Sequence, residues 1–376
     1  MKTFLDRIAA GDKTFFDVST FEQLSYLDTL KPVKDDWDRS FNQYKAQTFF
    51  QTKFKISILN FISFWCLFLF VPFYIILGLF IKREKSVEAI SRLKESEHCE
   101  PNSLLKRYNI DRTLWHVKGA ICPIDIPFVI NLWVRYFINP YFVIKSIYKI
   151  AKYSSLICRY SPHAIIVCDE FSFTSSILTL LCEGHGIKHI DVMHGEKMLY
   201  IRDSFFRFHE CFVWNEHYIK LFKMMQAEPT QFKIELPLSM KFEKADYKSF
   251  EYYADYKYYL ANYTEAEITS IVASMDFAKA LGKTVKFRPH PHYSDIPLLK
   301  KHVEERNIEL PSVDILVSLS NCQHVVGLYS TVLVQAYLNG CDVILDDVTY
   351  KKKYEKLADV KYILSNKVNH KLSELQ

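Results

Sequence analysis

The stretch from Ala164 to Glu196 reads AIIVCDEFSFTSSILTLLCEGHGIKHIDVMHGE and contains one strand–helix–strand unit. The runs Ala164–Cys168 and His189–His194 have the length and apolar composition of buried strands. Between them, the hydroxyl-rich stretch Thr174–Ser176 indicates a helix start, and a glycine pair beginning at Gly184 marks its far end. Strands that alternate with helices form parallel sheets with crossover helices, so this stretch predicts an α/β fold.

The same alternation continues along the chain in two blocks. The first block adds one strand-like run and the second has four: Glu210–Trp214, then Thr284–Phe287, Val313–Ser318, His324–Leu328 and Asp342–Leu345. A passage rich in Pro, Lys and Tyr, from Pro229 to about Tyr259, separates the blocks and is the expected linker. We predict Rossmann-like domains at 100–235 and 245–350, preceded by an N-terminal region (1–55) and a hydrophobic segment (56–81) and followed by a C-terminal tail (351–376).

The composition excludes several classes of function. The 376 residues suit two α/β domains, and 49% hydrophobic with 24% charged residues is typical of globular proteins. A formal charge of +5, with both signs interleaved along the sequence, does not indicate nucleic-acid binding. The chain has nine glycines and neither a G-x-G-x-x-G nor a Walker sequence, so dinucleotide and P-loop chemistry are not expected.

The nine cysteines are scattered, and several lie inside apolar runs. They are Cys66, Cys99, Cys122, Cys158, Cys168, Cys182, Cys211, Cys322 and Cys341. They contain no C-x-x-C pair, and the ligand spacing of zinc sites is missing, so we expect no metal site. Buried free thiols in a reducing compartment are the prediction.

The segment Ile56–Ile81 has 26 residues without a charge and is flanked on both sides by Lys and Arg. This length is sufficient for a bilayer span. Because about fifty mixed residues precede it, it resembles a retained anchor rather than a cleaved signal. Pro72 and Gly78 interrupt the run and both flanks are basic, so a re-entrant or in-plane helical pair is an alternative to a single span. A buried soluble hairpin is a third alternative. We expect association with a bacterial inner membrane, with the catalytic domains in the cytoplasm.

A second candidate for membrane contact is the stretch Tyr141–Tyr160. Lysines recur there at helical spacing, opposite an apolar face: Lys145, Lys149 and Lys152 against Phe142, Val143, Ile147, Ile150 and Ile157. The pattern fits a basic amphipathic helix on a membrane. It fits better an ordinary domain helix with a solvated lysine face, which is the prediction.

The pentapeptide Arg288-Pro289-His290-Pro291-His292 follows the predicted strand Thr284–Phe287. A residue before proline is held extended, and in an extended chain Arg288, His290 and His292 project to one side. Open α/β sheets bind ligands outside the carboxyl ends of their strands. We predict that these three side chains bind phosphate, against the alternative of a proline-rich turn with incidental histidines.

A hydroxyl pair follows the strand that begins at His324. Ser330 and Thr331 open the helical run Val332–Leu338, and the preceding Tyr329 is a further candidate for donor binding. A hydroxyl at a helix start caps free N–H groups, and those groups with the helix dipole form an anion site; a purely structural cap is the alternative. Since both features end consecutive strands, we expect the phosphate of a nucleotide donor between them.

In that arrangement His290 would hydrogen-bond or protonate the leaving phosphate, and Arg288 would pair with its charge. A general base for the acceptor hydroxyl is expected from two strand ends of the first domain. The candidates, in order, are His194, Glu196, Asp169 and Glu170. A helix cap is the alternative role of Asp169.

His290-Pro291 and Ser330-Thr331 resemble, in order and separation, two motifs of bacterial GT-B sialyltransferases and polysialyltransferases, and more loosely of capsule-assembly transferases. Those families also carry two acids followed by glycine in the first domain. Here Asp169-Glu170 is followed by Phe171, and His194-Gly195-Glu196 is the nearer positional match, so the base and the donor sugar stay open.

The resemblance covers Ala164 to Asp347, about half of the chain. It implies a GT-B fold, with two Rossmann-like domains facing a central cleft across which Arg288–His292 would face Asp169 and His194. It also implies that His290, Ser330 and Thr331 contact the phosphate of a CMP-sugar without a metal.

The expected function is a metal-independent, inverting glycosyltransferase that moves a sugar, sialic acid or another CMP-linked sugar, onto a lipid-linked surface glycan of the capsule or lipopolysaccharide type. The nucleotide-sugar is a substrate, and no cofactor is expected. Two alternatives stay open: a CDP-polyol phosphotransferase of the teichoic-acid type, and a non-catalytic membrane scaffold for polysaccharide assembly.

Overall fold

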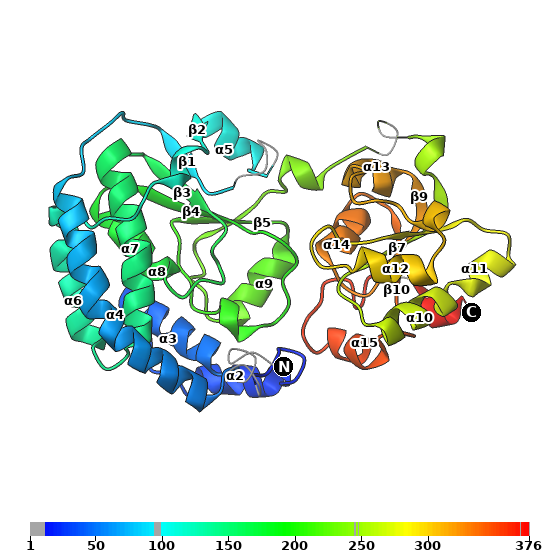
Figure 1. The fold of residues 1–376 in the computed structure, drawn as a ribbon, viewed down its shortest axis with the longest axis horizontal. Helices are drawn as coiled ribbons and strands as arrows, with labels where there is room; N and C mark the ends of the chain where they lie inside the picture. The colour runs from blue at the N-terminus through cyan, green and yellow to red at the C-terminus, as the bar shows by residue number, and fades with distance from the viewer. Residues whose placement is uncertain (1–11, 94–98, 244–245, 247, 369, 376) are drawn as a thin grey trace. The chain divides into compact units, whose positions relative to one another are not determined.

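The computed structural model describes residues 12–93, 99–243, 246, 248–368 and 370–375 (Figure 1). The chain forms two compact units. Unit 1 extends to His194 and includes Leu199–Leu238; unit 2 consists of Gly195–Met198 together with the chain from Ser239 onward. Each unit contains one parallel sheet, so the predicted pair of parallel α/β units is confirmed.

The sheet of unit 1 has six parallel strands in the order β2-β1-β3-β4-β5-β6. They are β1 (Ala89–Ser91), β2 (Ile110–Asp111), β3 (Ala164–Val167), β4 (Lys188–Val192), β5 (Glu210–Val213) and β6 (Phe232–Ile234). The three strands predicted here are confirmed within two residues. The order reverses between β1 and β3, which makes that point the topological switch of the sheet.

The sheet of unit 2 is parallel with the order β11-β10-β9-β7-β8. Its strands are β7 (Ala254–Tyr259), β8 (Val285–Arg288), β9 (Cys322–Gly327), β10 (Asp342–Leu345) and β11 (His370–Lys371). Numbered along the chain this is the doubly wound order 2-1-3-4-5, with the switch between β7 and β9. The predictions for β8, β9 and β10 are confirmed.

Three predictions for unit 2 are wrong. The stretch Val313–Ser318 overlaps the helix α13 (Ile315–Ser320), which begins where Asp314 accepts hydrogen bonds from two backbone N–H groups. A short apolar run is compatible with either a strand or a helix. The central strand β7 lies in the predicted linker. The sequence did not indicate a buried strand there because the strand contains a charged residue, Lys257, which the structure buries in an ion pair. Residues 351–376 are not a tail, since β11 pairs with β10.

Helices cover both sheets. In unit 1 they are α2 (Thr20–Asp28), α3 (Asp36–Thr48), α4 (Lys53–Leu79), α5 (Asn102–Arg107), α6 (Ile126–Tyr136), α7 (Pro140–Tyr160), α8 (Ser175–Gly184) and α9 (Glu216–Met224). In unit 2 they are α10 (Glu265–Ser274), α11 (Asp276–Ala280), α12 (Ile296–His302), α13, α14 (Thr331–Leu338) and α15 (Lys351–Leu357).

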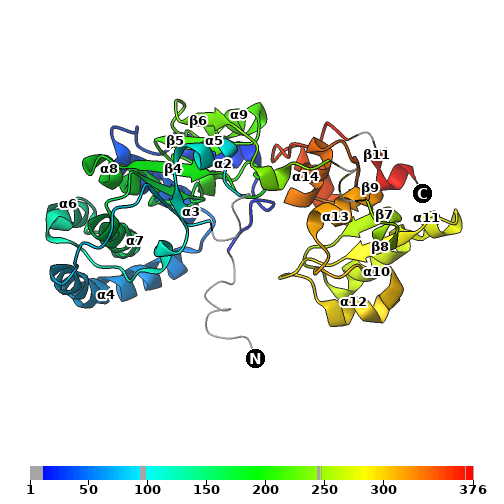
Figure 2. The same cartoon turned by 90° about the horizontal axis from the view of Figure 1, so that it is seen from above.

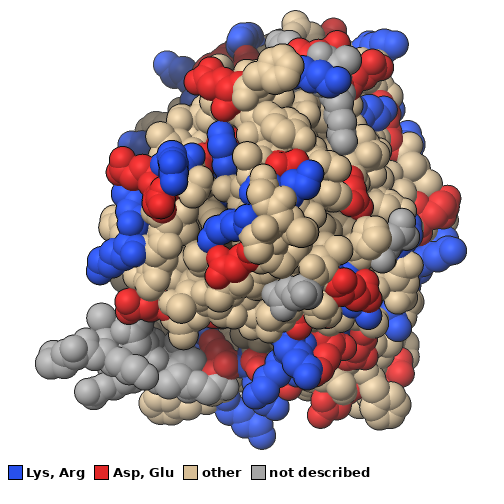
Figure 3. Space-filling model, turned by 90° about the vertical axis from the view of Figure 1, so that its right-hand side faces the viewer, with Lys and Arg blue, Asp and Glu red and all other residues tan. Residues whose placement is uncertain are grey.

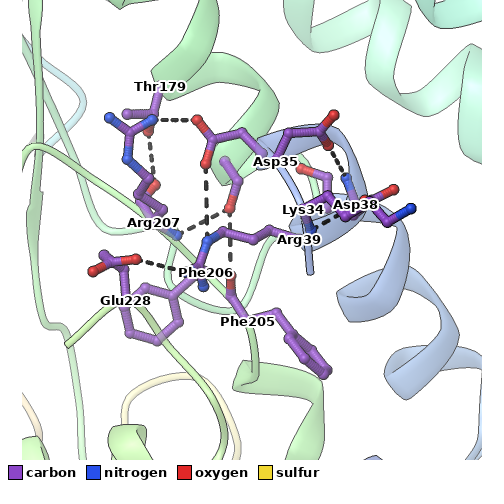
Figure 4. Close-up of polar contacts among 12 residues, drawn as sticks. Lys34, Asp35, Asp38, Arg39, Thr179, Phe205, Phe206, Arg207 and Glu228 are labelled. Carbon is purple, nitrogen blue, oxygen red and sulfur yellow. Dashed lines mark hydrogen bonds and ion pairs between the residues drawn. The ribbon is translucent and has the colours of Figure 1, made fainter. Parts of the chain in front are cut away.

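The helices before α4 are an integral part of unit 1. The Gln43 side chain on α3 donates to the carbonyl oxygens of Glu170, at 2.9 Å, and Arg202, at 3.1 Å. Arg39 on the same helix forms an ion pair with Glu228 at 2.5 Å (Figure 4). The described part of the N-terminal region, from Asp12 onward, therefore folds onto the sheet domain.

The hydrophobic segment is one continuous helix, α4, with Pro72 inside it, so the helical pair and the hairpin are wrong. The helix lies beside α6 and α7 in both ribbon views (Figures 1 and 2). Near its start Asn60 accepts from Tyr141 N at 3.1 Å, and near its end Tyr74 O accepts from Ile121 N at 2.9 Å. The helix is long and apolar enough to cross a membrane. Its attachment to unit 1 at both ends favours a helix that lies along the unit.

α7 is the domain helix that the sequence predicted. Its apolar face, including Phe142, Ile147 and Ile150, is buried in unit 1. The lysine face is more than a solvated surface, because Lys149 forms an ion pair with Asp169 at 3.0 Å and Lys152 donates to Val117 O at 2.5 Å.

The surface differs between regions. The face drawn in Figure 3 carries Lys and Arg side chains interspersed with Asp and Glu, which is typical of a solvated protein surface. The outer side of α4 instead exposes large apolar side chains, among them Phe61 (68%) and Leu69 (71%). Exposed apolar patches of this kind mark interaction sites.

The end of α4 depends on a close backbone approach at Gly78. A Cβ atom there would lie 1.7 Å from Ile121 O. We expect Gly78→Ala to lower the free energy of unfolding by about 2 kcal/mol, the usual cost of overpacking. Thermal or denaturant unfolding in mild detergent measures this effect.

Gly184→Ala is the matched control, because a Cβ there meets no atom within 4 Å. The helix preference of alanine should leave that variant unchanged or stabilise it by up to about 1 kcal/mol. Equal unfolding free energies for the two variants would contradict the packing described for α4.

Candidate functional site

A cavity of about 300 Å³ lies at the switch point of unit 2. It is lined by residues that follow three neighbouring strands: Tyr258–Asn262 from β7, Arg288–Pro291 from β8 and Leu328–Ser330 from β9, with Ile315, Val332, Tyr350 and Lys353. Ligands of open α/β sheets bind at this position. The structure thus brings four of the six predicted donor-binding residues to one cavity: Arg288, His290, Tyr329 and Ser330.

His290 is held in a defined orientation in this cavity. Its backbone N–H donates to the Ser294 hydroxyl at 2.8 Å, and its ring lies against Tyr293 with 4.5 Å between centroids. Nδ1 accepts the backbone N–H of His292 at 3.1 Å. Burial lowers the pKa of His290, and the neighbouring His292 lowers it further. The neutral ring with Nδ1 as acceptor carries its proton on Nε2, which makes Nε2 a hydrogen-bond donor.

Arg288 lines the cavity, but its guanidinium is already engaged. Nη1 pairs with Glu309 at 2.8 Å and Nη2 donates to Val313 O at 2.7 Å. Glu309 also forms an ion pair with Lys257 at 2.5 Å and accepts from the Ser318 hydroxyl. Burial opposes ionisation of Glu309, but Lys257 and the hydrogen bonds outweigh it and lower its pKa. Arg288 therefore supports the cavity wall.

His292 does not lie where the sequence placed it. β8 ends at Arg288, and the chain turns at Pro291–Tyr293, so the extended path predicted through His292 is wrong. The His292 side chain is exposed and is not among the residues that line the cavity. Proline fixes its own φ and biases the residue before it, but it does not prevent a turn that begins at Pro291.

The hydroxyl pair begins α14 as predicted. Ser330 is the N-cap, and its hydroxyl accepts from Leu333 N at 3.4 Å. Thr331 points elsewhere, because its hydroxyl accepts the backbone N–H of Glu196 at 3.0 Å. Tyr329 lines the cavity, and burial raises the pKa of its phenol.

A second cavity, of about 550 Å³, lies at the switch point of unit 1. Arg92 and Leu93 follow β1, Cys168 follows β3 and His194 follows β4; Cys99, Trp115, His116 and Lys152 complete the lining. His194 is the one predicted base among them. Its side chain is exposed to this cavity.

Two of the other three candidates for the base are engaged in ion pairs or fully buried. The Asp169 carboxylate, 2% exposed, forms ion pairs with Arg92 and Lys149. Glu170 is fully buried. Glu196 belongs to unit 2 and is half-buried, after Gly195, whose φ of +74° favours glycine. Asp169 does not have the alternative role of a helix cap, because no side chain forms a capping hydrogen bond at the start of α8.

Sequence reasoning missed several of the lining residues. Arg92 follows a strand of three residues, which is too short to give a pattern, and Trp115 and His116 lie in the short 3₁₀ helix η1 (Leu114–His116). Tyr258 and Tyr259 lie at the end of the stretch predicted to be the linker, and Leu260–Asn262 directly follow it. Within the described residues, there is no group of three or more His, Cys, Asp and Glu side chains that could hold a metal ion.

Glu309→Gln should destabilise unit 2. It leaves Lys257 and Arg288 buried without a countercharge, which typically costs about 3 to 5 kcal/mol. Because the pKa of Glu309 is lowered in the folded state, the carboxylate contributes stability above its unfolded pKa of about 4.3 and loses it as the pH falls through the folded pKa. Denaturant unfolding should show a smaller loss of stability on acidification for the variant. An unchanged pH dependence would contradict this.

No protein-family model matches the chain, and no curated protein matches it in sequence. Solved structures with a similar fold include the wall teichoic acid polymerase TagF, at 8% identity and a TM-score of 0.43, covering 87% of this chain and 84% of that one. Others are a UDP-N-acetylglucosamine 2-epimerase from Rickettsia bellii (10%, TM-score 0.40, covering 70% and 79%) and the glycotransferase of kitacinnamycin (11%, TM-score 0.40, covering 70% and 81%). The chain spans 61% of TagF soaked with CDPG and 42% of S. aureus TarM.

At such identities the likeness concerns the fold alone. The chain itself consists of two units, each built on one parallel sheet. None of these structures is a sialyltransferase. That Arg288–His292 face Asp169 and His194 across a cleft stays a prediction.

Proposed function

We propose that this protein is a metal-independent, inverting glycosyltransferase that binds a nucleotide-sugar in the cavity of unit 2 and transfers the sugar to a lipid-linked surface glycan bound by unit 1. The observation that carries the proposal is the cavity at the switch of β7 and β9, which combines an oriented imidazole donor, His290, with the hydroxyl-capped start of α14. Phosphate oxygens accept from both kinds of donor.

In the transfer, the acceptor oxygen attacks the anomeric carbon, the bond from this carbon to the phosphate oxygen breaks, and its electron pair stays on the phosphate. The leaving phosphate gains negative charge. His290 Nε2–H and the N-terminal dipole of α14 would stabilise that charge more in the transition state than in the ground state.

The acceptor hydroxyl must lose a proton. His194 is the best candidate for the base, because it is exposed at the unit 1 cavity while Asp169 is bound in two ion pairs. A base must reach the proton that it abstracts, and a carboxylate held between two cations is less available. Glu196 is the remaining candidate, and Glu170 is fully buried.

The finer donor class is also a proposal. A CMP-linked sugar such as sialic acid follows from the His-Pro and Ser-Thr resemblance. A CDP-polyol phosphotransferase is the second candidate, and the use of histidines at both cavities in place of free carboxylates favours it. Purified protein incubated with CMP-, UDP-, GDP- and CDP-linked donors and assayed for nucleotide release would identify the donor. Phosphorus transferred to the acceptor would indicate the phosphotransferase, and no nucleotide release with any donor would favour the non-catalytic scaffold.

His290→Ala should lower kcat about a hundredfold, since loss of one such donor typically costs about 3 kcal/mol in the transition state. The fold should remain intact because the imidazole is only half-buried. Steady-state kinetics with the identified donor measures this effect, and His292→Ala is the control, because that side chain lies outside the cavity lining. Near wild-type turnover of a normally folded His290→Ala protein would disprove the phosphate role.

Ser330→Ala should mainly weaken donor binding. The cap hydroxyl meets the phosphate in ground and transition states alike, so KM should rise more than kcat falls. Loss of the cap also costs about 1 kcal/mol of stability. A fall in kcat at unchanged KM would assign Ser330 to the chemical step instead.

Membrane association is part of the proposal. The apolar outer side of α4 would lie in the membrane interface. Phe61→Ser combined with Leu69→Ser should reduce binding to lipid vesicles at least tenfold, because burying each such side chain contributes about 2 kcal/mol. Phe250→Ser is the control, since this aromatic side chain is even more exposed but belongs to unit 2. Equal loss of binding in the control would refute the role of α4.

A further inference from the structure

A second hollow of unit 1, of about 530 Å³, lies next to the cavity that contains His194. The two hollows share four lining residues: Arg92, Trp115, His116 and Lys152. At its other side this hollow is lined by Phe73, Tyr74 and Leu77, from the last turns of α4. A continuous wall of residues thus connects the end of the apolar helix to the candidate base.

The wall is strongly basic. Arg92, Lys118, Lys149 and Lys152 line this hollow, and among the residues that the structure describes no acidic residue lines either hollow. The Asp169 carboxylate pairs with Arg92 and Lys149 from a buried position, and the Asp169 backbone N–H donates to the buried Asp191. One buried carboxylate in contact with two of four cations leaves an excess of positive charge in the hollow.

Three of these cations are held in place. Asp169 fixes Arg92 and Lys149, and the Lys152 ammonium donates to Val117 O at 2.5 Å and lies 5.6 Å from the centre of the Trp115 ring. Burial lowers the pKa of Lys152. A bound anion would offset this desolvation, so the hollow gains from an anionic ligand. Fixed cations also lose little entropy when they bind one.

The apolar side of the hollow continues onto an open surface. Phe73 is 52% exposed, and along α4 the Phe68 ring lies 6.0 Å from Trp133 of α6. α6 itself exposes Ile130 and Val134. A ligand in the hollow therefore meets fixed cations on one side and an apolar helix pair on the other, which is the chemistry of an amphiphile with an anionic head group.

We propose that this hollow binds the phosphate or diphosphate of a lipid-anchored acceptor, whose hydrocarbon chain follows α4 and whose glycan extends toward His194. The proposal rests on the proposed transfer function and names the link between lipid and glycan as a phosphate ester. Arg92, Lys118, Lys149 and Lys152 bind the phosphate, and Trp115 lines the passage to the cavity of His194.

The test measures binding without any donor, so that it is independent of catalysis. The full-length protein is bound to phosphatidylcholine vesicles alone, to the same vesicles containing a polyprenyl phosphate, and to vesicles of matched charge containing phosphatidylglycerol. We expect the tightest binding to the polyprenyl phosphate vesicles. Lys118→Ala and Lys152→Met should each weaken that binding about fivefold, the effect expected of one cation near an anionic lipid. Binding to phosphatidylcholine alone should not change.

Lys145→Ala is the matched control, because Lys145 is an exposed lysine on the same helix, α7, outside both linings. Lys118 is exposed, so its variant should fold even if Lys152→Met does not. The proposal would be overturned if Lys118→Ala and Lys152→Met both bound the polyprenyl phosphate vesicles like the wild type, or if Lys145→Ala lost as much binding as they do. Equal affinity of the wild type for the phosphatidylglycerol vesicles would also overturn it. So would inorganic pyrophosphate bound as tightly as the polyprenyl phosphate vesicles, which would indicate a soluble ligand.

The two proposals fail in different ways. Nucleotide release with a soluble glycan acceptor, combined with unselective vesicle binding, would retain the transferase and overturn the lipid phosphate site. Selective vesicle binding without nucleotide release from any donor would contradict the transferase, and with it the assignment of the bound lipid as an acceptor.

Discussion

A buried carboxylate at the carboxyl end of each sheet holds one arginine and one lysine, and the walls of both cavities depend on these ion pairs. In unit 1 Asp169 pairs with Arg92 and Lys149; in unit 2 Glu309 pairs with Arg288 and Lys257. Each carboxylate joins elements that are distant in the chain: Asp169 follows β3 and pairs with Arg92 after β1, and Glu309 pairs with one residue of β7 and one of β8. Burial makes such pairs costly to break, so the side chains at the two switch points are held in defined positions.

The two cavities use this arrangement differently. In unit 2 the Arg288 guanidinium is engaged by hydrogen-bond partners within the cavity wall. The polar groups available to a ligand are the imidazole of His290 and the capped start of α14. In unit 1 the hollow next to Asp169 is lined by four cations and, within the described part of the chain, by no acidic residue. The first environment suits a nucleotide phosphate bound through hydrogen bonds, and the second suits an anion bound through charge.

The apolar helix α4 connects the fold to the membrane proposal. It is attached to unit 1 by Asn60 and Tyr74 and by the close approach of Gly78 to Ile121, so it cannot move independently of the sheet domain. The last turns of α4 line the basic hollow. An acceptor that reaches the protein through a membrane would thus meet the cations before it meets His194.

The sequence by itself determined the parallel α/β class, most strands, the cap at Ser330 and the long apolar helix, because these features arise from local periodicity and from hydroxyls at helix starts. It could not determine β7, because the burial of Lys257 depends on Glu309, which is 52 positions away in the chain. It also misplaced His292. The chain turns from Pro291 onward, and this turn depends on contacts of His290 with Ser294 and Tyr293 that the sequence pattern does not show. The engagement of Arg288 and Asp169 and the basic hollow beside α4 were decided by tertiary structure alone, because the charge around a side chain depends on partners that folding brings from distant segments.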